Sequence, residues 1–335
     1  MTRTRKRRIS ESSTPFDGEP QQPPLEPVTQ AFVDGLAPGD GPHGAPSIDA
    51  ARAALQAIQS RPTARPLTLA EDVISPIGPS GSLRLHLVRP ATAKQCLPIV
   101  VLLHGGGWSL GDAMTHDRLA RELAVGARAA VAIVEFSRSP ENRFPVAIEE
   151  AYAATKYLVE NAASLSLDGS RIAVAGDGSG GNIAAAVTLL CKQRGGPKLS
   201  FQVLFYPVTG ADFDTPSYRT FAEGPWLTKK AMQRFWTAYL PDQAHRGAII
   251  ATPVNATVDQ LRGLPDAMIM TVESDVLRDE GETYARKLAD ANVRVTCLRY
   301  LGTIHDFVML NALADTPAAR SAVAQAVHAL REALD

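Results

Sequence analysis

IAVAGDGSGGN, at residues 172–182, is the stretch of sequence that says most about the fold. A continuously apolar run comes first, a turn with four glycines follows, and small and apolar residues continue over 183–190. This order predicts a buried strand, a tight turn and a helix. Such a turn builds either an anion site at a helix N-terminus or a sharp bend that presents a nucleophile. The segment lacks the lysine and the glycine spacing of a phosphate-binding loop.

Short strand-like runs alternate with helical stretches on both sides of this segment. The predicted strands are Leu69–Ile77, Leu83–Val88, Ile99–Leu103, Ala130–Phe136, Ile172–Ala175, Phe201–Tyr206, Ala267–Thr271 and Val293–Tyr300. The predicted helices between and after the later strands span 116–127, 145–163, 180–194, 279–291 and 316–333. Strands that alternate with helices indicate an α/β fold, in which helices cover both faces of a parallel sheet.

Two further segments do not fit this alternation. About 60 residues separate the strand ending at Tyr206 from the strand starting at Ala267, which is too long for a plain crossover. This segment contains a helix-like stretch, Thr228–Leu240, and residues 26–62 also have helical spacing of apolar residues. We therefore predict a helical cap, made from about 26–62 and 208–250, over the carboxyl edge of the sheet. Ligands of open α/β sheets bind at that edge.

The composition limits the choice of partner and compartment. The chain has 335 residues, 45% hydrophobic, with a formal net charge of −1. Nucleic acid and membrane surfaces are bound by proteins that carry an excess of charge of one sign. A nearly neutral chain lacks that excess, so neither is expected as a partner. Apolar runs are far shorter than the roughly 20 residues of a transmembrane helix. Three cysteines without metal or disulfide spacing predict a reducing, cytoplasmic compartment.

The first 25 residues differ from the rest of the chain. Residues 2–8 read TRTRKRR, and a stretch rich in Ser, Pro and Gln follows. No apolar core follows the basic run, so a secretory signal is not predicted. We expect residues 1–25 to be a disordered basic tail and residues 26–335 to form one domain.

Two more places combine unusual residues directly after predicted strands. His104-Gly105-Gly106-Gly107-Trp108 follows the strand at 99–103, and successive glycines let backbone N–H groups turn toward one point, as an oxyanion hole requires. Asp275 and His305 follow the last two strands, so they can meet at one edge of the sheet. There the acid would orient the imidazole and stabilise its protonated form. Asp279 is a second candidate acid, although it also suits the first turn of the helix at 279–291.

These motifs, in this order, resemble the hormone-sensitive-lipase branch of the α/β-hydrolases. They are HGGGW, a GD-x-x-GGN turn, DVLRDEG-x-x-YA and G-x-x-HDF, and the resemblance covers roughly residues 26–333. It implies a mostly parallel eight-stranded sheet with a helical cap, and a serine carboxylesterase or lipase acting on small to medium acyl esters. It also implies no cofactor and no metal, and it allows a homodimer.

The resemblance assigns roles to individual residues. Gly105 and Gly106 match the oxyanion glycines, Asp275 the triad acid and His305 the triad base. The chain order of nucleophile, acid and histidine is the order of this fold. Aromatic side chains are further candidates for lining the acyl pocket, although each could equally be ordinary core: Trp108, Phe136, Trp226, Phe235 and Trp236.

The turn departs from the family pattern at one position. The pattern is G-x-S-x-G, and aligning its glycines with Gly176 and Gly180 puts Gly178 where the nucleophilic serine is expected. Ser179 falls one residue later, where a backbone N–H normally completes the oxyanion hole. If Ser179 took the apex instead, the crowded position two residues before it would hold Asp177.

Three interpretations therefore remain. In the first, the chain is a hydrolase whose nucleophile has been replaced and whose activity is weak or absent. In the second, the glycine-rich turn rearranges, and Ser179 acts as a displaced nucleophile with Asp275 and His305. In the third, the protein holds a small ligand under the cap and is a binding module on a hydrolase fold.

Overall fold

An eight-stranded sheet runs through the molecule and carries the glycine-rich turn at its centre. The computed structural model describes residues 22–37, 41–93 and 96–335, so most of the predicted basic tail lies outside the described residues. The strand order is β1-β2-β4-β3-β5-β6-β7-β8. The strands are β1 (Thr68–Ser75), β2 (Leu83–Pro90), β3 (Leu97–Leu103), β4 (Ala130–Val134), β5 (Leu167–Asp177), β6 (Phe201–Phe205), β7 (Asp266–Ser274) and β8 (Val295–Ile304).

The pairing of the strands confirms a mostly parallel sheet. The pairs from β4 through β3, β5, β6 and β7 to β8 are all parallel, and only β2 runs antiparallel to its neighbours. Every residue of β3 and β4 is buried, whereas β1 and β8 at the edges of the sheet have several exposed residues each. Central strands are apolar throughout because helices cover both of their faces.

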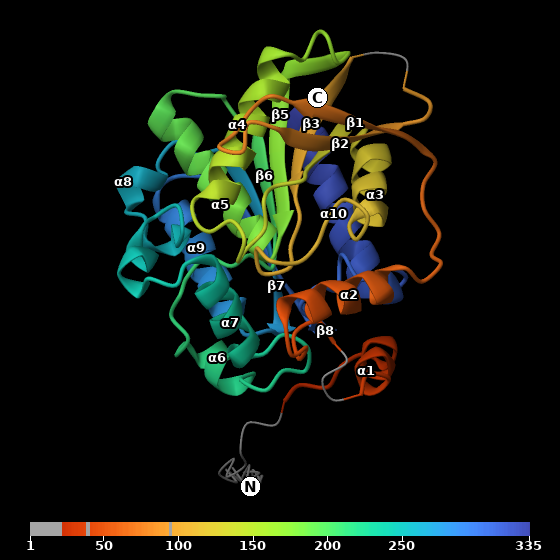
Figure 1. Cartoon of the computed structure of the whole chain (residues 1–335), viewed down its shortest axis with the longest axis vertical. Coiled ribbons are helices and arrows are strands. Elements are labelled where there is room, and N and C mark those ends of the chain that lie inside the picture. The colour runs from red at the N-terminus through yellow and green to blue at the C-terminus, as the bar shows by residue number, and fades with distance from the viewer. Residues whose placement is uncertain (1–21, 38–40, 94–95) are drawn as a thin grey trace, which may run out of the picture.

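Helices pack on both faces of the sheet and beyond one of its ends. They are α1 (Pro27–Asp34), α2 (Ile48–Gln59), α3 (Asp117–Ala127), α4 (Val146–Glu160), α5 (Ser179–Arg194), α6 (Pro216–Thr220), α7 (Lys229–Tyr239), α8 (Val258–Leu261), α9 (Arg278–Asp290) and α10 (Pro317–Leu334). Helices α3 and α10 contact each other, and α4 contacts α5 across the sheet from them (Figure 1). The predicted α/β fold, with helices on both faces, is confirmed.

Helices α1, α2, α6 and α7 lie together at the end of the sheet where the parallel strands finish (Figure 1). Arg52 of α2 donates to the carbonyl of Ser109 at 2.8 Å, and Arg234 of α7 donates to the carbonyl of Pro42 at 3.2 Å. Thr228 caps α7 by accepting a hydrogen bond from the Ala231 N–H. These helices occupy the two segments from which the sequence predicted a cap.

No described helix is both long and apolar enough to cross a membrane. Cys96, Cys191 and Cys297 are free thiols, two of them exposed. The cytoplasmic location and the homodimer stay predictions.

The start of α5 lies unusually close to the end of β3. A Cβ built on Gly180 would lie 1.9 Å from the carbonyl oxygen of Leu103, and a Cβ on Gly176 would lie 2.3 Å from the carbonyl oxygen of Gly180. Only residues without a side chain allow this approach. The glycines at 176 and 180 therefore set the distance between the helix and the sheet. The sequence predicts small residues at these positions, because they lie two residues before and after the apex of a sharp turn.

We expect Gly180→Ala to lower the free energy of unfolding by about 3 kcal/mol or more, because the new methyl group meets backbone rather than a movable side chain. Thermal unfolding followed by circular dichroism measures the effect. Gly247→Ala is the matched control, since a Cβ there has no heavy atom within 4 Å. Equal melting temperatures for the two variants would contradict the close packing.

Candidate active site

Gly178 forms the apex of the turn between β5 and α5. Its backbone angles are φ 51° and ψ −115°. Its N–H donates to the Phe205 carbonyl at 2.9 Å, and its carbonyl accepts from the Val208 N–H at 3.0 Å. A Cβ built on Gly178 would lie 3.2 Å from Nε2 and 3.5 Å from Cε1 of His305. Any side chain at this position would therefore point at the imidazole.

Ser179 is the first residue of α5, and its hydroxyl has a different neighbour. The Oγ atom accepts a hydrogen bond from the backbone N–H of Trp108 at 3.0 Å, and the residue is 2% exposed. This bond ties the helix to the glycine-rich loop after β3. The hydroxyl thus faces that loop, although Ser179 also lines the small cavity beside His305.

The two predicted oxyanion glycines of the loop after β3 differ in their surroundings. The N–H of Gly105 donates to Oδ1 of Asp177 at 2.9 Å, so this donor is already hydrogen-bonded within the protein. Gly106 and Gly107 line the cavity beside His305, and Gly105 does not. Within the described part of the chain, the N–H groups of Gly106 and Gly107 have no acceptor. Of the two predicted donors, Gly106 thus presents its N–H beside the cavity, whereas the N–H of Gly105 is bonded to Asp177.

Asp275 and His305 meet as the strand order predicted. Ser274 pairs with Ile304, so the ends of β7 and β8 lie side by side, and each of the two residues follows directly. Nδ1 of His305 lies 2.7 Å from Oδ2 of Asp275, and both residues are buried. The other carboxylate oxygen of Asp275 accepts the Leu277 N–H at 3.0 Å. The carboxylate is thus fixed and can orient the imidazole.

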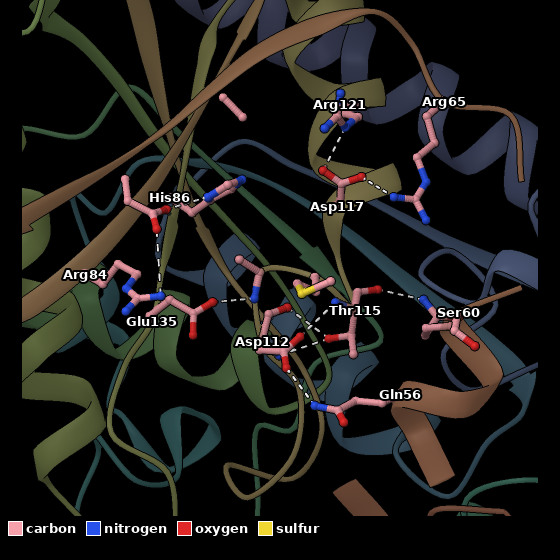
Figure 2. A pocket seen from close by; sticks show the side chains of 15 residues that line it. Gln56, Ser60, Arg65, Arg84, His86, Asp112, Thr115, Asp117, Arg121 and Glu135 are labelled. Atoms are coloured by element: carbon pink, nitrogen blue, oxygen red, sulfur yellow. Dashed lines mark hydrogen bonds and ion pairs between the residues drawn. The ribbon is translucent and has the colours of Figure 1, made fainter. Parts of the chain in front are cut away.

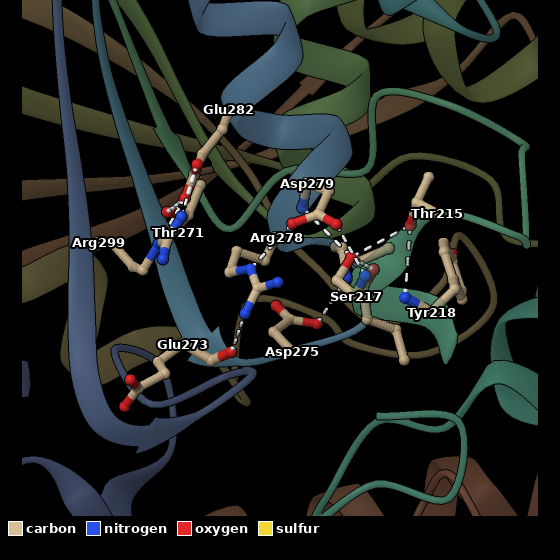
Figure 3. Close-up of polar contacts among 12 residues, drawn as sticks. Thr215, Ser217, Tyr218, Thr271, Glu273, Asp275, Arg278, Asp279, Glu282 and Arg299 are labelled. Carbon is tan, nitrogen blue, oxygen red and sulfur yellow. Dashed lines mark hydrogen bonds and ion pairs between the residues drawn. The ribbon is translucent and has the colours of Figure 1, made fainter. Parts of the chain in front are cut away.

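Asp279, the alternative acid, has other partners. It lies in the first turn of α9, where its Oδ2 accepts the Ser217 N–H at 2.7 Å and its Oδ1 accepts from Arg278 at 2.9 Å. Figure 3 shows this group beside Asp275. Asp279 therefore anchors α6 to α9 instead of contacting His305.

A second carboxylate, which the sequence analysis did not single out, lies on the other side of His305. Oδ1 of Asp306 is 3.4 Å from Nε2 of His305. Its Oδ2 accepts a hydrogen bond from the Trp226 indole at 2.8 Å and lies 3.2 Å from Nε2 of His43. Two cap segments thus converge on Asp306. In the sequence, only the place of Asp306 directly after His305 in the HDF motif indicates that it belongs to the site.

These contacts change the proton affinity of both histidines. Burial alone would lower the pKa of His305, but the carboxylates of Asp275 and Asp306 outweigh it and raise that pKa to about 9. For His43, burial dominates and lowers the pKa despite its hydrogen bond to the Asp306 carboxylate. Burial would raise the pKa of Asp306, but His305 and the hydrogen bonds from His43 and Trp226 hold it well below its usual range. The two carboxylates therefore favour the protonated form of the His305 imidazole.

The space beside His305 is small and closed by the cap. The cavity measures about 10 Å³. Its lining consists of His43, Gly106, Gly107, Ser179, Val208, Leu227, Met232, Phe235, His305 and Asp306. A Cβ on Gly107 would lie 2.3 Å from the Phe235 ring, so this cap side chain rests directly on the glycine-rich loop.

The predicted pocket aromatics divide into two groups. Phe235 lines the cavity, and Trp226 reaches Asp306. Trp108 is fully buried and stacks on Tyr239 with ring centroids 4.2 Å apart, and Trp236 packs against Trp108. Phe136 stacks on the ring of His104. The structure thus places Trp108 in the core beside the site, outside the cavity lining.

A much larger cavity lies elsewhere in the described structure. It measures about 890 Å³ and opens between α2, the strands β1 and β2, and the segment before α3 (Figure 2). Its charged side chains already pair with one another, as in Arg65 and Arg121 on Asp117. None of the predicted site residues lines it. In the described residues, no three His, Cys, Asp or Glu side chains are grouped to hold a metal ion.

Comparison with known proteins defines the class. A family model described as the alpha/beta hydrolase fold matches residues 100–309. The carboxylesterase NlhH of Mycobacterium tuberculosis is 37% identical over 320 residues, which cover 93% of this chain and 97% of that protein. A thermostable esterase from Pseudomonas putida is 44% identical and superposes with a TM-score of 0.90 over 95% of this chain and 99% of its own.

A hyperthermophilic esterase from Pyrobaculum calidifontis is more distant, at 33% identity and a TM-score of 0.81 over 93% of this chain and 100% of its own. The chain belongs to the α/β-hydrolase fold family. Within that family it is a carboxylesterase-type hydrolase by lineage, of the hormone-sensitive-lipase-like branch that its motifs resemble.

We expect Asp306→Asn to make His305 titrate below a pH of about 9, because the variant removes one of the two negative charges that favour the imidazolium. NMR of the imidazole nitrogens, recorded against pH, measures the change. Asparagine tolerates the positive φ of 67° at this position, so the loop is retained. Asp214→Asn, at an exposed carboxylate, is the control. An unchanged titration of His305 in Asp306→Asn would show that Asp275 alone sets its pKa.

Proposed function

We propose that this chain is a carboxylic-ester hydrolase of the serine esterase lineage, acting on small to medium acyl esters, in which Gly178 takes the place of the nucleophile. The observation that carries the proposal is the position of a Cβ at residue 178, 3.2 Å from Nε2 of His305. A serine hydroxyl at that apex would lie within reach of the base. With glycine there, the remaining groups leave the enzyme weakly active.

Each remaining group has a defined task in acyl transfer. His305 accepts the proton of the attacking group and returns it to the leaving alcohol. Asp275 holds the imidazole in the tautomer whose Nε2 faces the substrate. The N–H groups of Gly106, Gly107 and Ser179 bind the oxyanion. Gly106 and Gly107 are preferred to the predicted pair because Asp177 already accepts the Gly105 N–H.

The contacts of Ser179 favour Gly178 over Ser179 as the nucleophile position. Its Oγ already accepts a hydrogen bond from Trp108, and using the hydroxyl as a nucleophile would break the tie between α5 and the glycine-rich loop. A shift of one residue at the start of a helix also turns a side chain by roughly 100°. The displaced-nucleophile interpretation therefore requires a rearrangement of the turn that the Gly178 interpretation does not.

Substrate entry requires movement of the cap. The cavity of about 10 Å³ is far smaller than an ester such as p-nitrophenyl butyrate. Leu227, Met232 and Phe235 come from the cap side and line this cavity, with the Phe235 ring against Gly107. The acyl chain would occupy the volume that Leu227, Met232 and Phe235 vacate when the cap moves.

We expect Gly178→Ser to raise kcat/KM for p-nitrophenyl butyrate by several orders of magnitude. Loss of a triad nucleophile costs about 10⁶ in kcat, and the oxyanion hole and binding leave about 10³ over water. A fluorophosphonate should add to the Gly178→Ser chain, read as an intact-mass shift, and should not add to the chain as written. Gly178→Ala is the matched control, because it has the same backbone conformation without the hydroxyl.

Two results would contradict this proposal. A high rate in the chain as written that Ser179→Ala abolishes would establish the displaced nucleophile. No gain and no adduct in Gly178→Ser would leave the binding-module interpretation. Adding His305→Ala to Gly178→Ser should remove the gain, and an unchanged rate would disprove the triad assignment.

We expect Phe235→Leu, in the Gly178→Ser background, to shift the preferred acyl chain toward longer esters, because a smaller side chain frees space above Gly107. The ratio of kcat/KM for p-nitrophenyl octanoate to that for the butyrate measures the shift. Phe221→Leu is the control, since Phe221 is equally buried but lies outside the cavity lining. An equal ratio in both variants would place the acyl chain elsewhere.

A further inference from the structure

We propose that His116 positions the oxyanion hole through Asp177: its imidazole holds the Asp177 carboxylate, and that carboxylate holds the N–H of Gly105 at the start of the glycine-rich loop. Neither side chain lines the cavity beside His305, so both are positioning residues that act through the loop. The inference rests on the esterase function proposed above and adds these two residues to its machinery.

The carboxylate of Asp177 fixes the first peptide group of the loop. Its Oδ1 accepts the Gly105 N–H at 2.9 Å, and a Cβ built on Gly105 would overlap this carboxylate. The next peptide group is fixed at its carbonyl, since the Gly105 oxygen lies 3.1 Å from Nδ1 of His104. The carbonyl and the N–H of a trans peptide point in opposite directions, so the N–H of Gly106 points away from His104. The direction of this predicted oxyanion donor therefore depends on the two contacts.

His116 is the partner of the Asp177 carboxylate. Its Nε2 lies 3.2 Å from Oδ1 and 3.3 Å from Oδ2 of Asp177, and both side chains are fully buried. Among the residues that the structure describes, no other side chain pairs with this carboxylate. Removing one partner of a buried ion pair leaves an uncompensated charge, which is strongly unfavourable. The position of the Asp177 carboxylate therefore depends on His116.

The hydrogen bonds of His116 define where its protons lie. The Thr115 hydroxyl donates to the Asp112 carbonyl at 2.9 Å, so it accepts from Nδ1 of His116, which is 3.0 Å away. Nε2 faces the carboxylate oxygens of Asp177, which only accept. The Gly105 N–H also lies 3.3 Å from Nε2, but its shorter contact is with Asp177. Both ring nitrogens are therefore placed to donate, as in the imidazolium form.

The charges around His116 favour the same form. Burial alone would lower the pKa of His116, but the Asp177 carboxylate outweighs it and raises that pKa above its ordinary value. The Asp306 carboxylate also favours the protonated imidazole. His104, whose ring centroid lies 5.6 Å from that of His116, stays neutral because burial lowers its pKa to about 3. His116 is thus the group that balances the charge of Asp177 beside the loop.

This balance of charge bears on acyl transfer. The substrate is a neutral ester, and its negative charge develops only as the tetrahedral intermediate forms. An uncompensated carboxylate beside Gly105 would oppose that charge, and a loop released from Asp177 would misplace the N–H donors. Loss of His116 should therefore slow the chemical step more than it weakens substrate binding.

Variants in the Gly178→Ser background test this role. We expect His116→Leu to lower kcat for p-nitrophenyl butyrate by about 10², the typical cost of a group misplaced by about 1 Å, with little change in KM. His116→Gln should recover part of the loss, because its amide can still donate to the carboxylate. His86→Leu is the matched control, since it removes a histidine–aspartate contact of 2.7 Å, to Asp72, at the edge of the sheet. Equal losses in His116→Leu and His86→Leu, or a loss that appears in KM alone, would overturn the inference.

A double variant separates the charge of the pair from its packing. Asparagine at position 177 keeps an oxygen for the Gly105 N–H but carries no charge. His116→Leu with Asp177→Asn should therefore have a higher kcat than His116→Leu alone. Losses that simply add in the double variant would show that the two residues act independently, and this would contradict the inference.

NMR on the chain as written tests the contact without any need for activity. His116 should titrate above pH 6.5, its ordinary value, and the Gly105 amide resonance should move over the same pH range. Asp177→Asn should lower the pH at which His116 titrates. A Gly105 resonance that does not follow His116, or an unchanged titration in Asp177→Asn, would overturn the inference.

The two measurements also separate this inference from the proposed function. If Gly178→Ser gains no activity while the Gly105 amide follows the titration of His116, the proposed function fails and the link between His116 and the loop is kept. If Gly178→Ser is active and His116→Leu leaves its kcat unchanged, only this inference fails.

Discussion

The backbone hydrogen bonds of Gly178 are the constraint on which the rest of the site depends. Its N–H and carbonyl bind the Phe205 carbonyl and the Val208 N–H, so the end of β5 is tied to the segment after β6. Helix α5 begins at the next residue and packs against β3 through Gly180. Because backbone groups hold this turn, its direction does not depend on a side chain at its apex. The chain can therefore keep the geometry of a hydrolase site with glycine at position 178.

Much of this arrangement could be predicted from the sequence, because its signals are local. Apolar runs and helical periodicity located the strands and helices, and the parallel topology placed the ends of β7 and β8 together. The contact between Asp275 and His305 follows from that topology alone, since each residue comes directly after its strand. The crowding at Gly176 and Gly180 follows from the geometry of a sharp strand-to-helix turn.

The remaining features depend on contacts between distant segments. The carboxylate of Asp177 accepts the Gly105 N–H, and no pattern in HGGGW reveals that this predicted donor is already bonded. His43 and Asp306 are 263 residues apart, and the cap segment that carries His43 has no motif. Trp108 follows the glycines as a pocket aromatic might, yet its ring faces the core because Tyr239 offers a stacking surface there.

The positive φ of Gly178 has an evolutionary consequence. A serine at this apex would hold a conformation that costs an L-residue of order 1 kcal/mol or more, and glycine adopts it freely. In the serine-to-glycine exchange that the proposed function supposes, loss of the hydroxyl would relax the turn and spare the fold. Catalysis and fold stability would then make opposite demands on residue 178.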